Sequence, residues 1–246
     1  MGTVRNFQQN SYTYQNHTVS YHSEYKIPRI QSALKRLMDI LASALLIIVL
    51  FPFMAVIAAA IVLNSKGGAF FKQKRIGKDM QPFTIYKFRT MEQNAEKKHK
   101  RAEVFSSKDP RLTSVGSFLR RTKIDEFPQL LNILKGDMSL VGPRPMLARH
   151  KKYYKGYKRD RFMLKPGLTG LAQVSGGVFI PLGDRAEYDV DYVRDFSILL
   201  DIKILFKTLV IIFVGERRFI RPHMQGMPAV STPIRIAAHE KKESIA

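Results

Sequence analysis

Two adjacent carboxylates, Asp125 and Glu126, stand out as residues that could do chemistry. Basic side chains lie close to them in the sequence: Arg120 precedes the pair, and Arg144 stands in the rigid turn Val-Gly-Pro-Arg-Pro at 141–145. Carboxylates are ligands for Mg²⁺, and arginine binds phosphate oxygens through a planar fork of donors. The pattern indicates a metal-assisted phosphate site in which Asp125 and Glu126 hold the metal. The alternative is structural, because an acidic pair at a helix start acts as a cap worth about 1 kcal/mol.

A helix is predicted directly after the pair. Apolar residues recur at helical spacing from Phe127 to Leu134. Pro128 suits a first helical turn, and Gly136 suits a C-terminal cap. The pair would then lie at a helix N-terminus, where backbone amides point outward and anions bind readily. A shorter amphipathic helix is predicted before it, at 112–121.

Two strands, at 69–75 and 82–90, are predicted to form a β-hairpin around a Gly-Lys-Asp turn. Alternation along the second strand places Lys87 and Arg89 on one face. Asp189 lies in the unusually acidic stretch DRAEYDVDYVRD. One interpretation is a set of phosphate-binding cations with a supporting carboxylate. The other is a solvated strand face and a solvated helix start.

The longest apolar run, at 40–63, reads ILASALLIIVLFPFMAVIAAAIVL. As a helix it would reach roughly 36 Å, enough to cross a hydrocarbon core of about 30 Å. Pro52 near its middle predicts a kink or break, because proline lacks a backbone donor and clashes with the preceding turn. Basic residues flank both ends, and a hairpin that enters and returns places both flanks on the cytoplasmic side. A re-entrant hairpin is favoured, and a kinked spanning helix remains the alternative.

A second apolar stretch, at 196–214, contains Asp201, Lys203 and Lys207. These charges would cost about 9 kcal/mol near a bilayer centre, against roughly 7 kcal/mol gained from the apolar residues. The balance predicts a helix that lies in the membrane interface or packs on the domain.

The net charge of +21 in 246 residues predicts a polyanionic partner. Nucleic acid, an anionic phospholipid membrane and phosphorylated substrates all meet that description, and the adjacent apolar run favours the membrane. The chain has no cysteine, which excludes disulfides, thiolate metal sites and cysteine nucleophiles.

These features predict an α+β, helix-rich, monotopic membrane protein with a small β-hairpin and interfacial amphipathic helices. Residues 1–31 are expected to be a polar, mobile extension, and 32–66 a proline-broken re-entrant membrane helix. Residues 67–214 are expected to be the cytoplasmic catalytic domain, followed by a basic tail at 215–246.

Several motifs appear in unbroken order across about residues 33–214. They are KRLMDI before the apolar run, YKFRTM at 86–91, IDEFPQLLNILKGDMSLVGPRP at 124–145, KPGLTGLAQVSG at 165–176, and YDVDYV followed by LLDIKILFKT. Together they resemble the bacterial sugar transferases, in particular the small monotopic polyprenyl-phosphate hexose-1-phosphate transferases.

The resemblance implies that a sugar-1-phosphate moves from a UDP-sugar to undecaprenyl phosphate with release of UMP. This is the first membrane step of exopolysaccharide, capsule or other glycan synthesis. It implies that Asp125 is the nucleophile and Glu126 its partner, with Mg²⁺ as cofactor, in a ping-pong reaction through a covalent aspartyl-phosphosugar. The predicted substrate-binding residues are Lys87, Arg89, Arg120, Arg144 and Asp189. The resemblance also implies the bacterial cytoplasmic (inner) membrane, with the catalytic domain on its cytoplasmic face and a hairpin broken at Pro52.

The chain departs from the family pattern at three positions. Gly177 stands where an arginine usually follows Gln-Val-Ser-Gly, and Arg185 is one residue that could replace it. Lys123 and Phe127 stand where serine and leucine are common. Neither of these two changes touches the acidic pair. The missing arginine at Gly177 bears on donor binding, so the resemblance does not imply which sugar is transferred.

Two other classes of protein compete with the enzyme. One is a non-catalytic, membrane-attached scaffold for glycan assembly. The other is a basic nucleic-acid-binding protein, which the charge alone suggests and for which no recognition motif is present. A homo-oligomer is compatible with the sequence and is not specified by it.

Overall fold

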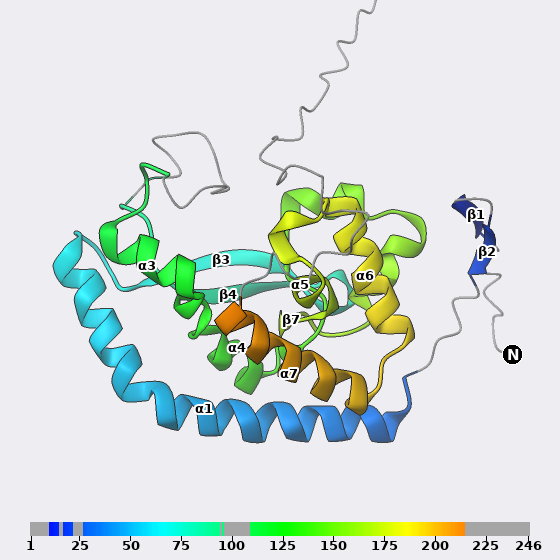
Figure 1. The fold of residues 1–246 in the computed structure, drawn as a ribbon, viewed down its shortest axis with the longest axis horizontal. Coiled ribbons are helices and arrows are strands. Elements are labelled where there is room, and N and C mark those ends of the chain that lie inside the picture. The colour runs from blue at the N-terminus through cyan, green and yellow to red at the C-terminus, as the bar shows by residue number, and fades with distance from the viewer. Residues whose placement is uncertain (1–9, 15–16, 22–26, 94, 96–108, 215–246) are drawn as a thin grey trace, which may run out of the picture.

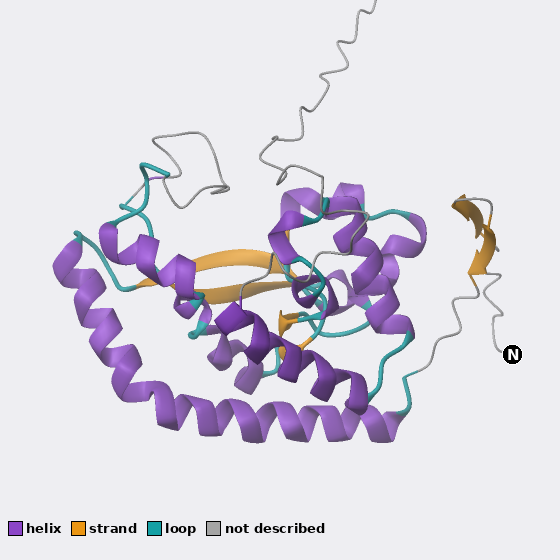
Figure 2. Cartoon of the chain, in the orientation of Figure 1, coloured by secondary structure: helices purple, strands orange, loops and turns teal. Residues whose placement is uncertain are grey.

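The computed structural model describes residues 10–14, 17–21, 27–93, 95 and 109–214, and Figures 1 and 2 show a helix-rich mixture of helices and strands. The α-helices are α1 (Arg29–Asn64), α3 (Ser114–Thr122), α4 (Gln129–Lys135), α5 (Leu171–Val174), α6 (Leu182–Arg194) and α7 (Ile198–Val214). The strands are β1 (Asn10–Tyr14), β2 (His17–Tyr21), β3 (Phe70–Ile76), β4 (Pro82–Phe88), β5 (Ser139–Val141), β6 (Met146–Leu147) and β7 (Gly167–Thr169). Short 3-10 turns are η1 (Lys78–Met80), η2 (Ile124–Glu126), η3 (Ala148–Tyr153), η4 (Gly156–Phe162) and η5 (Gly177–Phe179).

Helix α1 is the longest element, and it is bent rather than broken. It has 36 residues and contains Pro52, and Figure 1 shows a long arm and a shorter arm that rises away from it. The predicted break is therefore a bend, because one missing hydrogen bond weakens a helix of this length without ending it. At about 54 Å, α1 is long and apolar enough to cross a membrane by length and composition alone.

The predicted β-hairpin is confirmed. Strands β3 and β4 pair antiparallel, with Phe70 opposite Phe88 and Ile76 opposite Pro82. Two features of the sheet structure were not predicted. The two-residue strand β6 joins the free edge of β3, and β5 pairs in parallel with β7 in a separate two-stranded sheet.

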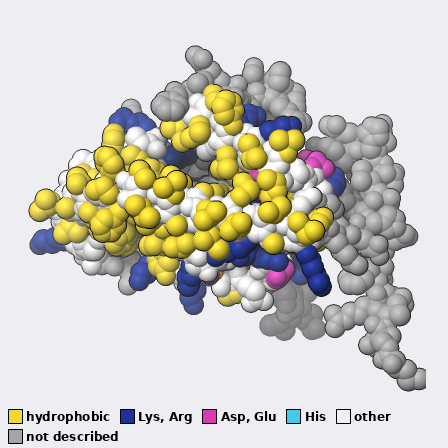
Figure 3. Space-filling model, turned by 90° about the horizontal axis from the view of Figure 1, so that it is seen from below, with side chains coloured by type: hydrophobic (Ala, Val, Ile, Leu, Met, Phe, Trp, Pro, Cys, Tyr) yellow, Lys and Arg dark blue, Asp and Glu magenta, His cyan; other side chains and the backbone are white. Residues whose placement is uncertain are grey.

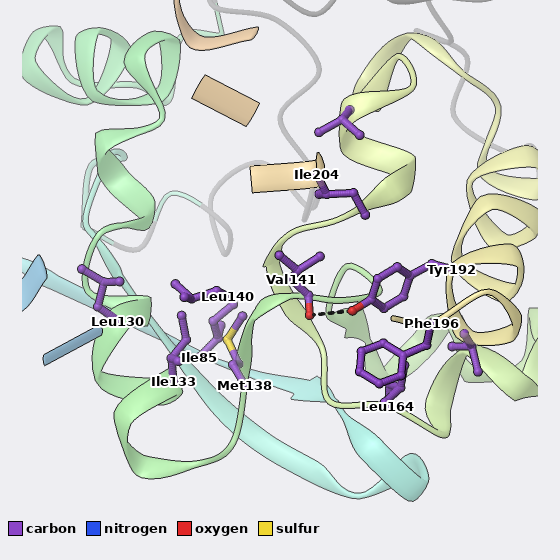
Figure 4. Packing of buried hydrophobic residues seen from close by; sticks show 12 residues of the cluster. Ile85, Leu130, Ile133, Met138, Leu140, Val141, Leu164, Tyr192, Phe196 and Ile204 are labelled. Carbon is purple, nitrogen blue, oxygen red and sulfur yellow. Dashed lines mark hydrogen bonds between the residues drawn. The ribbon is translucent and has the colours of Figure 1, made fainter. Parts of the chain in front are cut away.

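The hydrophobic core lies between the hairpin, α4, α6 and α7. Figure 4 shows Ile85, Leu130, Val141, Tyr192 and other buried members of this cluster. The first arm of α1 adds Ala42, Ile47 and Leu50 to its edge. A second cluster, formed by Ile61, Ala69, Phe88 and Leu119, is joined by Met54, Ile57 and Ala58 of the second arm. Both arms of α1 therefore pack on the same domain.

A buried polar network fixes the start of α1. Lys35 donates to Asp201 at 2.5 Å and to the Val141 carbonyl at 2.9 Å. Asp39 accepts hydrogen bonds from the Ser139 hydroxyl and the Leu140 amide. The charge of Asp201 argued against insertion of the stretch at 196–214, and the structure agrees, because Asp201 is buried against Lys35 and α7 packs on the domain.

The underside of the molecule is predominantly apolar, as Figure 3 shows from below. Helices α1 and α7 contribute large exposed apolar side chains to the surface, including Leu41, Leu45, Ile48, Val49, Phe51, Phe53, Leu199, Ile202, Phe206, Leu209 and Ile212. Lysines and arginines border the face in Figure 3. An apolar face of this kind is compatible with a membrane anchor.

The tails are only partly described. Within the predicted extension at 1–31, β1 and β2 form an antiparallel pair with Ser11 opposite Ser20. Residues 27–31 are also described, and α1 begins among them at Arg29. The remaining residues of the extension, 1–9, 15–16 and 22–26, lie outside the described ranges, and its predicted mobility stays a prediction. The predicted tail at 215–246 also lies outside them.

Candidate active site

The acidic pair lies at a corner between two helices. Lys123 caps α3 in a left-handed conformation, with φ of 62°, and so turns the chain. The turn η2 then carries Asp125 and Glu126, and α4 begins at Gln129. The predicted order of an acidic pair followed by a helix is confirmed, with the pair held in its own 3-10 turn.

Glu126 forms ion pairs with two basic side chains. Its Oε1 accepts from Lys87 at 2.5 Å and from Arg144 at 2.9 Å, so β4 and the Pro-Arg-Pro turn meet at this carboxylate. The Glu126 side chain is 12% exposed. Burial alone would raise the pKa of Glu126, but Arg144 and Lys87 lower it well below its usual value. Glu126 is therefore ionised at every pH at which the protein would work.

Asp125 differs from its neighbour. It is 5% exposed, and within the described ranges both ion pairs of the acidic pair go to Glu126 and none to Asp125. Burial raises the pKa of Asp125, and the negative charge of Glu126 raises it further. Lys87 and Arg120 act in the opposite direction. Asp125 is thus a buried carboxylate in a cationic field, without a direct ionic partner.

Arg120 faces the pair from the end of α3. Burial lowers the pKa of Arg120, while the charges of Asp125 and Glu126 oppose that effect. Its Nη1 is buried and has no hydrogen-bond partner among the residues that the structure describes. A guanidinium with an unused donor beside two carboxylates can bind an oxygen of an anionic ligand.

Arg89 does not lie with these residues, and it stands just beyond β4, which ends at Phe88 and not at the predicted residue 90. Its guanidinium donates to the carbonyls of Ser65 and Lys66 and to the Ser65 hydroxyl, just beyond the end of α1. It therefore satisfies acceptors that the end of a helix leaves open. Alternation along the predicted strand placed Lys87 and Arg89 together, but the structure separates their partners: Lys87 donates to Glu126, and Arg89 donates to residues beyond the end of α1.

Asp189 does not contact the acidic pair directly and is linked to it through Arg161 and Arg144. It is 1% exposed and accepts a 2.5 Å hydrogen bond from Arg161, whose Nη2 also donates to the Arg144 carbonyl. Burial raises the pKa of Asp189 to about 6, and Arg161 opposes the rise. The sequence did not single out Arg161, because the basic run Lys-Arg-Asp-Arg-Phe is typical of a solvated surface. No local pattern marks which member of that run is buried.

Gly177 stands where the family pattern has an arginine, and Arg185 was the predicted substitute. Gly177 has φ of 52°, a left-handed conformation that suits glycine and strains a larger residue. Arg185, the predicted substitute, donates from Nε to the Ile180 carbonyl at 2.8 Å. That contact ties Arg185 to the loop that follows Gly177.

The two carboxylates fit Mg²⁺ as part of its coordination shell. Among the described residues there is no group of three or more His, Cys, Asp or Glu side chains that could hold a metal alone. Mg²⁺ commonly binds through one or two carboxylates and completes its shell with water and substrate phosphates. Asp125 and Glu126 supply that number, so the donor set is compatible with a metal bound together with a diphosphate.

Comparison with known proteins gives a family match. A family model described as "Bacterial sugar transferase" matches residues 30–215. The matched range runs from α1 to the end of α7 and contains the acidic pair and its cations.

Individual relatives have similar names. The chain is 38% identical over 199 residues to the UDP-glucose:undecaprenyl-phosphate glucose-1-phosphate transferase of Escherichia coli (strain K12), which covers 77% of this chain and 42% of that protein. It is 40% identical over 195 residues to the UDP-N-acetylgalactosamine-undecaprenyl-phosphate N-acetylgalactosaminephosphotransferase of Aeromonas hydrophila, over 76% of this chain and 45% of that protein. It is 41% identical over 183 residues to the uncharacterized sugar transferase EpsL of Bacillus subtilis (strain 168), over 74% of this chain and 89% of that protein. The chain thus spans less than half the length of the first two relatives.

Proposed function

The chain belongs to the bacterial sugar transferase family, and from this premise we propose that it moves a sugar-1-phosphate from a UDP-sugar to undecaprenyl phosphate and releases UMP. The observation that carries the proposal is the buried pair Asp125–Glu126 with Lys87, Arg120 and Arg144 around it. A carboxylate in a cationic field suits attack on an anionic phosphorus centre. The names of the Escherichia coli and Aeromonas hydrophila relatives agree with this substrate class.

Asp125 is the nucleophile of the first step. A carboxylate oxygen of Asp125 attacks the phosphorus that bears the sugar, and the bond from that phosphorus to the UMP oxygen breaks. UMP leaves with the electron pair, and a covalent aspartyl-phosphosugar remains. An ionised carboxylate needs no separate base for this attack.

The second step regenerates the enzyme. A phosphate oxygen of undecaprenyl phosphate attacks the same phosphorus, and Asp125 leaves as a carboxylate. The product is a sugar linked to the lipid through a diphosphate. No proton is gained or lost across the two steps, so a buried carboxylate can serve twice without a proton relay.

Glu126 and the cations stabilise charge on the transferring group. Glu126 holds Lys87 and Arg144 beside Asp125, where both can face phosphate oxygens. Arg120 adds its unused donor from the other helix. Mg²⁺, held by Asp125 and Glu126, would supply further positive charge against the repulsion between carboxylate and diphosphate.

The membrane part of the proposal is a re-entrant helix in the cytoplasmic leaflet of the bacterial inner membrane. The support is that the domain packs on both arms of α1, at Ala42 and Leu50 on one side of the bend and at Ile57 and Ile61 on the other. A spanning helix would carry its far arm across roughly 30 Å of hydrocarbon, away from a domain on the near side. The acceptor's phosphate also lies at that surface, level with the acidic pair, while its prenyl chain stays in lipid.

The proposal is tested by the release of UMP from a panel of UDP-hexoses by the full chain in lipid nanodiscs. With at least one donor, UMP should be released over many turnovers, and only when Mg²⁺ and undecaprenyl phosphate are present. Without the acceptor, the first step alone should limit UMP to about one equivalent per enzyme. Asp125→Asn should lower kcat by about 1,000-fold or more, because an amide cannot form the covalent intermediate. The exposed Lys135→Gln serves as the control and should retain activity.

A protein with no activity on any donor, for which Asp125→Asn behaves like the wild type, would instead be a membrane-attached scaffold. The active donor in the panel would identify the sugar.

A further inference from the structure

Arg144 is held through its backbone by a buried ion pair. Arg161 donates from Nη2 to the Arg144 carbonyl at 2.8 Å. The same nitrogen donates to Asp189 Oδ2 at 2.5 Å, and the nearby Arg144 backbone helps to lower the pKa of that carboxyl. The carbonyl of Arg144 is therefore fixed by one pair of side chains, from η4 and α6.

Arg161 is not placed to touch a ligand itself. It is 2% exposed, and its guanidinium lies 4.7 Å from the centre of the Tyr154 ring and 5.4 Å from that of Phe162. Its Nε and Nη1 are buried and have no hydrogen-bond partner within the described part of the chain. The two aromatic rings and the hydrogen bonds of Nη2 fix the position of Arg161. Through Nη2, Arg161 also contacts the backbone of Arg144.

The Arg144 side chain, in contrast, needs support. It is 43% exposed, and it contacts the acidic pair through a 2.9 Å hydrogen bond to Glu126. A long, partly exposed side chain can adopt many rotamers, so the place where it leaves the backbone decides whether its guanidinium reaches the site. The prolines at 143 and 145 stiffen the turn, and the buried pair fixes where the turn sits.

We propose that Arg161 is a positioning residue, which acts through the Arg144 backbone to set the Arg144 guanidinium beside Glu126 and the transferring phosphate. This inference rests on the function proposed above. Misplacement of a catalytic group by about 1 Å is enough to lower a rate by about 100-fold. Loss of Arg161 should therefore reduce kcat more than it changes the donor KM.

Four variants of the full chain in nanodiscs test the inference. Arg161→Gln removes the donor, and Arg161→Lys keeps the charge without the planar fork. The double variant Arg161→Met with Asp189→Leu replaces the buried ion pair by apolar side chains, which commonly preserves a fold. Arg159→Gln changes a neighbouring cation of η4 whose guanidinium contacts the Met80 sulfur and not the turn, and it is the matched control.

All four should melt cooperatively, and Arg159→Gln should keep wild-type kcat. Arg161→Gln and the double variant should lose kcat by about 30–100-fold, with donor KM changed by less than about threefold. Arg161→Lys should recover part of the loss. A folded double variant with wild-type kcat would overturn the inference.

A double-mutant cycle separates positioning from a general structural role. If Arg161 acts through Arg144, adding Arg161→Gln to Arg144→Ala should lower kcat by less than about threefold further, because Arg144 is no longer there to be placed. Losses that multiply fully would show that Arg161 acts independently of Arg144, and would refute the inference.

A readout that needs no turnover distinguishes this inference from the proposed function. Amide hydrogen exchange in the segment 139–147 should be faster in Arg161→Gln than in Arg159→Gln, because the clamp on the Arg144 backbone is gone. Unchanged exchange would contradict the inference alone. A wild-type chain that is inactive on every donor, yet shows the faster exchange in Arg161→Gln, would contradict the proposed function and leave the clamp in place.

Discussion

Asp125 and Glu126 are neighbours in the chain, yet their surroundings push their pKa values in opposite directions. Glu126 is paired with Lys87 and Arg144, which hold its pKa low. Asp125 is buried and has no ionic partner among the residues that the structure describes, and its pKa is raised, first by burial and then by the charge of Glu126. This difference matches the two roles proposed for the pair: Glu126 holds the cations, and Asp125 is the proposed nucleophile.

The pH dependence of the reaction should reveal this arrangement. Only ionised Asp125 attacks phosphorus, so the rate should rise with pH through the pKa of Asp125. Arg120→Gln removes a cation that lowers this pKa, so the acid limb should move to higher pH. Glu126→Gln removes an anion that raises it, so the acid limb should move to lower pH. Both variants should lower kcat by about tenfold or more, because each loses charge stabilisation.

The measurement is kcat for UMP release as a function of pH, with Arg121→Gln as the control. Arg121 is exposed on α3 and stacks on Phe118, so its loss should leave the acid limb in place. Equal shifts in the Arg120→Gln and Glu126→Gln variants, or shifts of the same sign, would contradict the assignment of Asp125 as the titrating nucleophile.

Most of the acidic pair's immediate surroundings could be predicted from the sequence, and the layer behind them could not. Lys87, Arg120 and Arg144 could be predicted to lie near the pair because they stand in short motifs whose residue types suit phosphate chemistry. Arg161 and the route taken by Arg89 could not be predicted, because they depend on which segments meet in space. Whether each of these residues binds substrate stays a prediction.

At the scale of elements, Arg89 ties the hairpin to the end of the long helix. Arg89→Met should destabilise the protein by about 2 kcal/mol, because several charge-assisted hydrogen bonds beyond the end of α1 are lost. That corresponds to a melting temperature lower by about 4–8 °C for a chain of this size. Donor KM should stay near the wild-type value, since Arg89 lies away from Glu126.

Thermal unfolding in detergent and steady-state kinetics measure the two effects. Lys74→Met, an exposed position on β3, is the control and should melt like the wild type. If Arg89→Met raises the donor KM and leaves the melting temperature unchanged, the result would support the phosphate contact that the sequence predicted for Arg89.

Pro52 decides the path of α1. Pro52→Ala restores a backbone donor and should straighten the helix, which separates its second arm from the cluster around Ile61. Single cysteines at Ser32 and Lys66 report the two ends, since the natural chain has none. Both should be labelled only from the cytoplasmic side with Pro52 present, and position 66 should become accessible from outside in Pro52→Ala.

Phe53→Ala, which changes an exposed apolar neighbour and not the bend, should leave both labels on the cytoplasmic side. Labelling of either end from outside in the otherwise unaltered chain would exclude the re-entrant path and favour a kinked spanning helix.

Elements with a strong local period were predictable, and the short ones were not. The β3–β4 hairpin, α4 with its glycine cap and α7 all carry a recognisable pattern over six or more residues. Strands β5, β6 and β7 have two or three residues each. A period cannot be read from so few positions, and their pairing partners come from distant parts of the chain, so only the folded structure reveals them.

At the scale of the whole molecule, the apolar underside and the charge of +21 make separate contributions to membrane binding. Salt at about 1 M, where the Debye length is about 3 Å, should remove the electrostatic part and leave the protein in the membrane. Detergent should be needed to release it, because burial of apolar surface does not depend on screening. Sedimentation of washed membranes measures this, and release by salt alone would mean that the apolar face is not inserted.

The two ends of α1 are held by residues that the ribosome makes at different times. The first arm is held through Lys35 and Asp39 by Ser139 and Asp201, which are made last. Arg89 and Leu119, which hold the second arm, lie 25 and 55 residues beyond Asn64. At about 5–20 residues per second, they are synthesised roughly one to eleven seconds after that arm. The second arm is therefore a free apolar helix during synthesis, open to the machinery that inserts membrane proteins. On the proposed re-entrant path, the domain must fold onto the second arm before that arm crosses the membrane, so slower synthesis of residues 65–119 should increase the share of chains that span it.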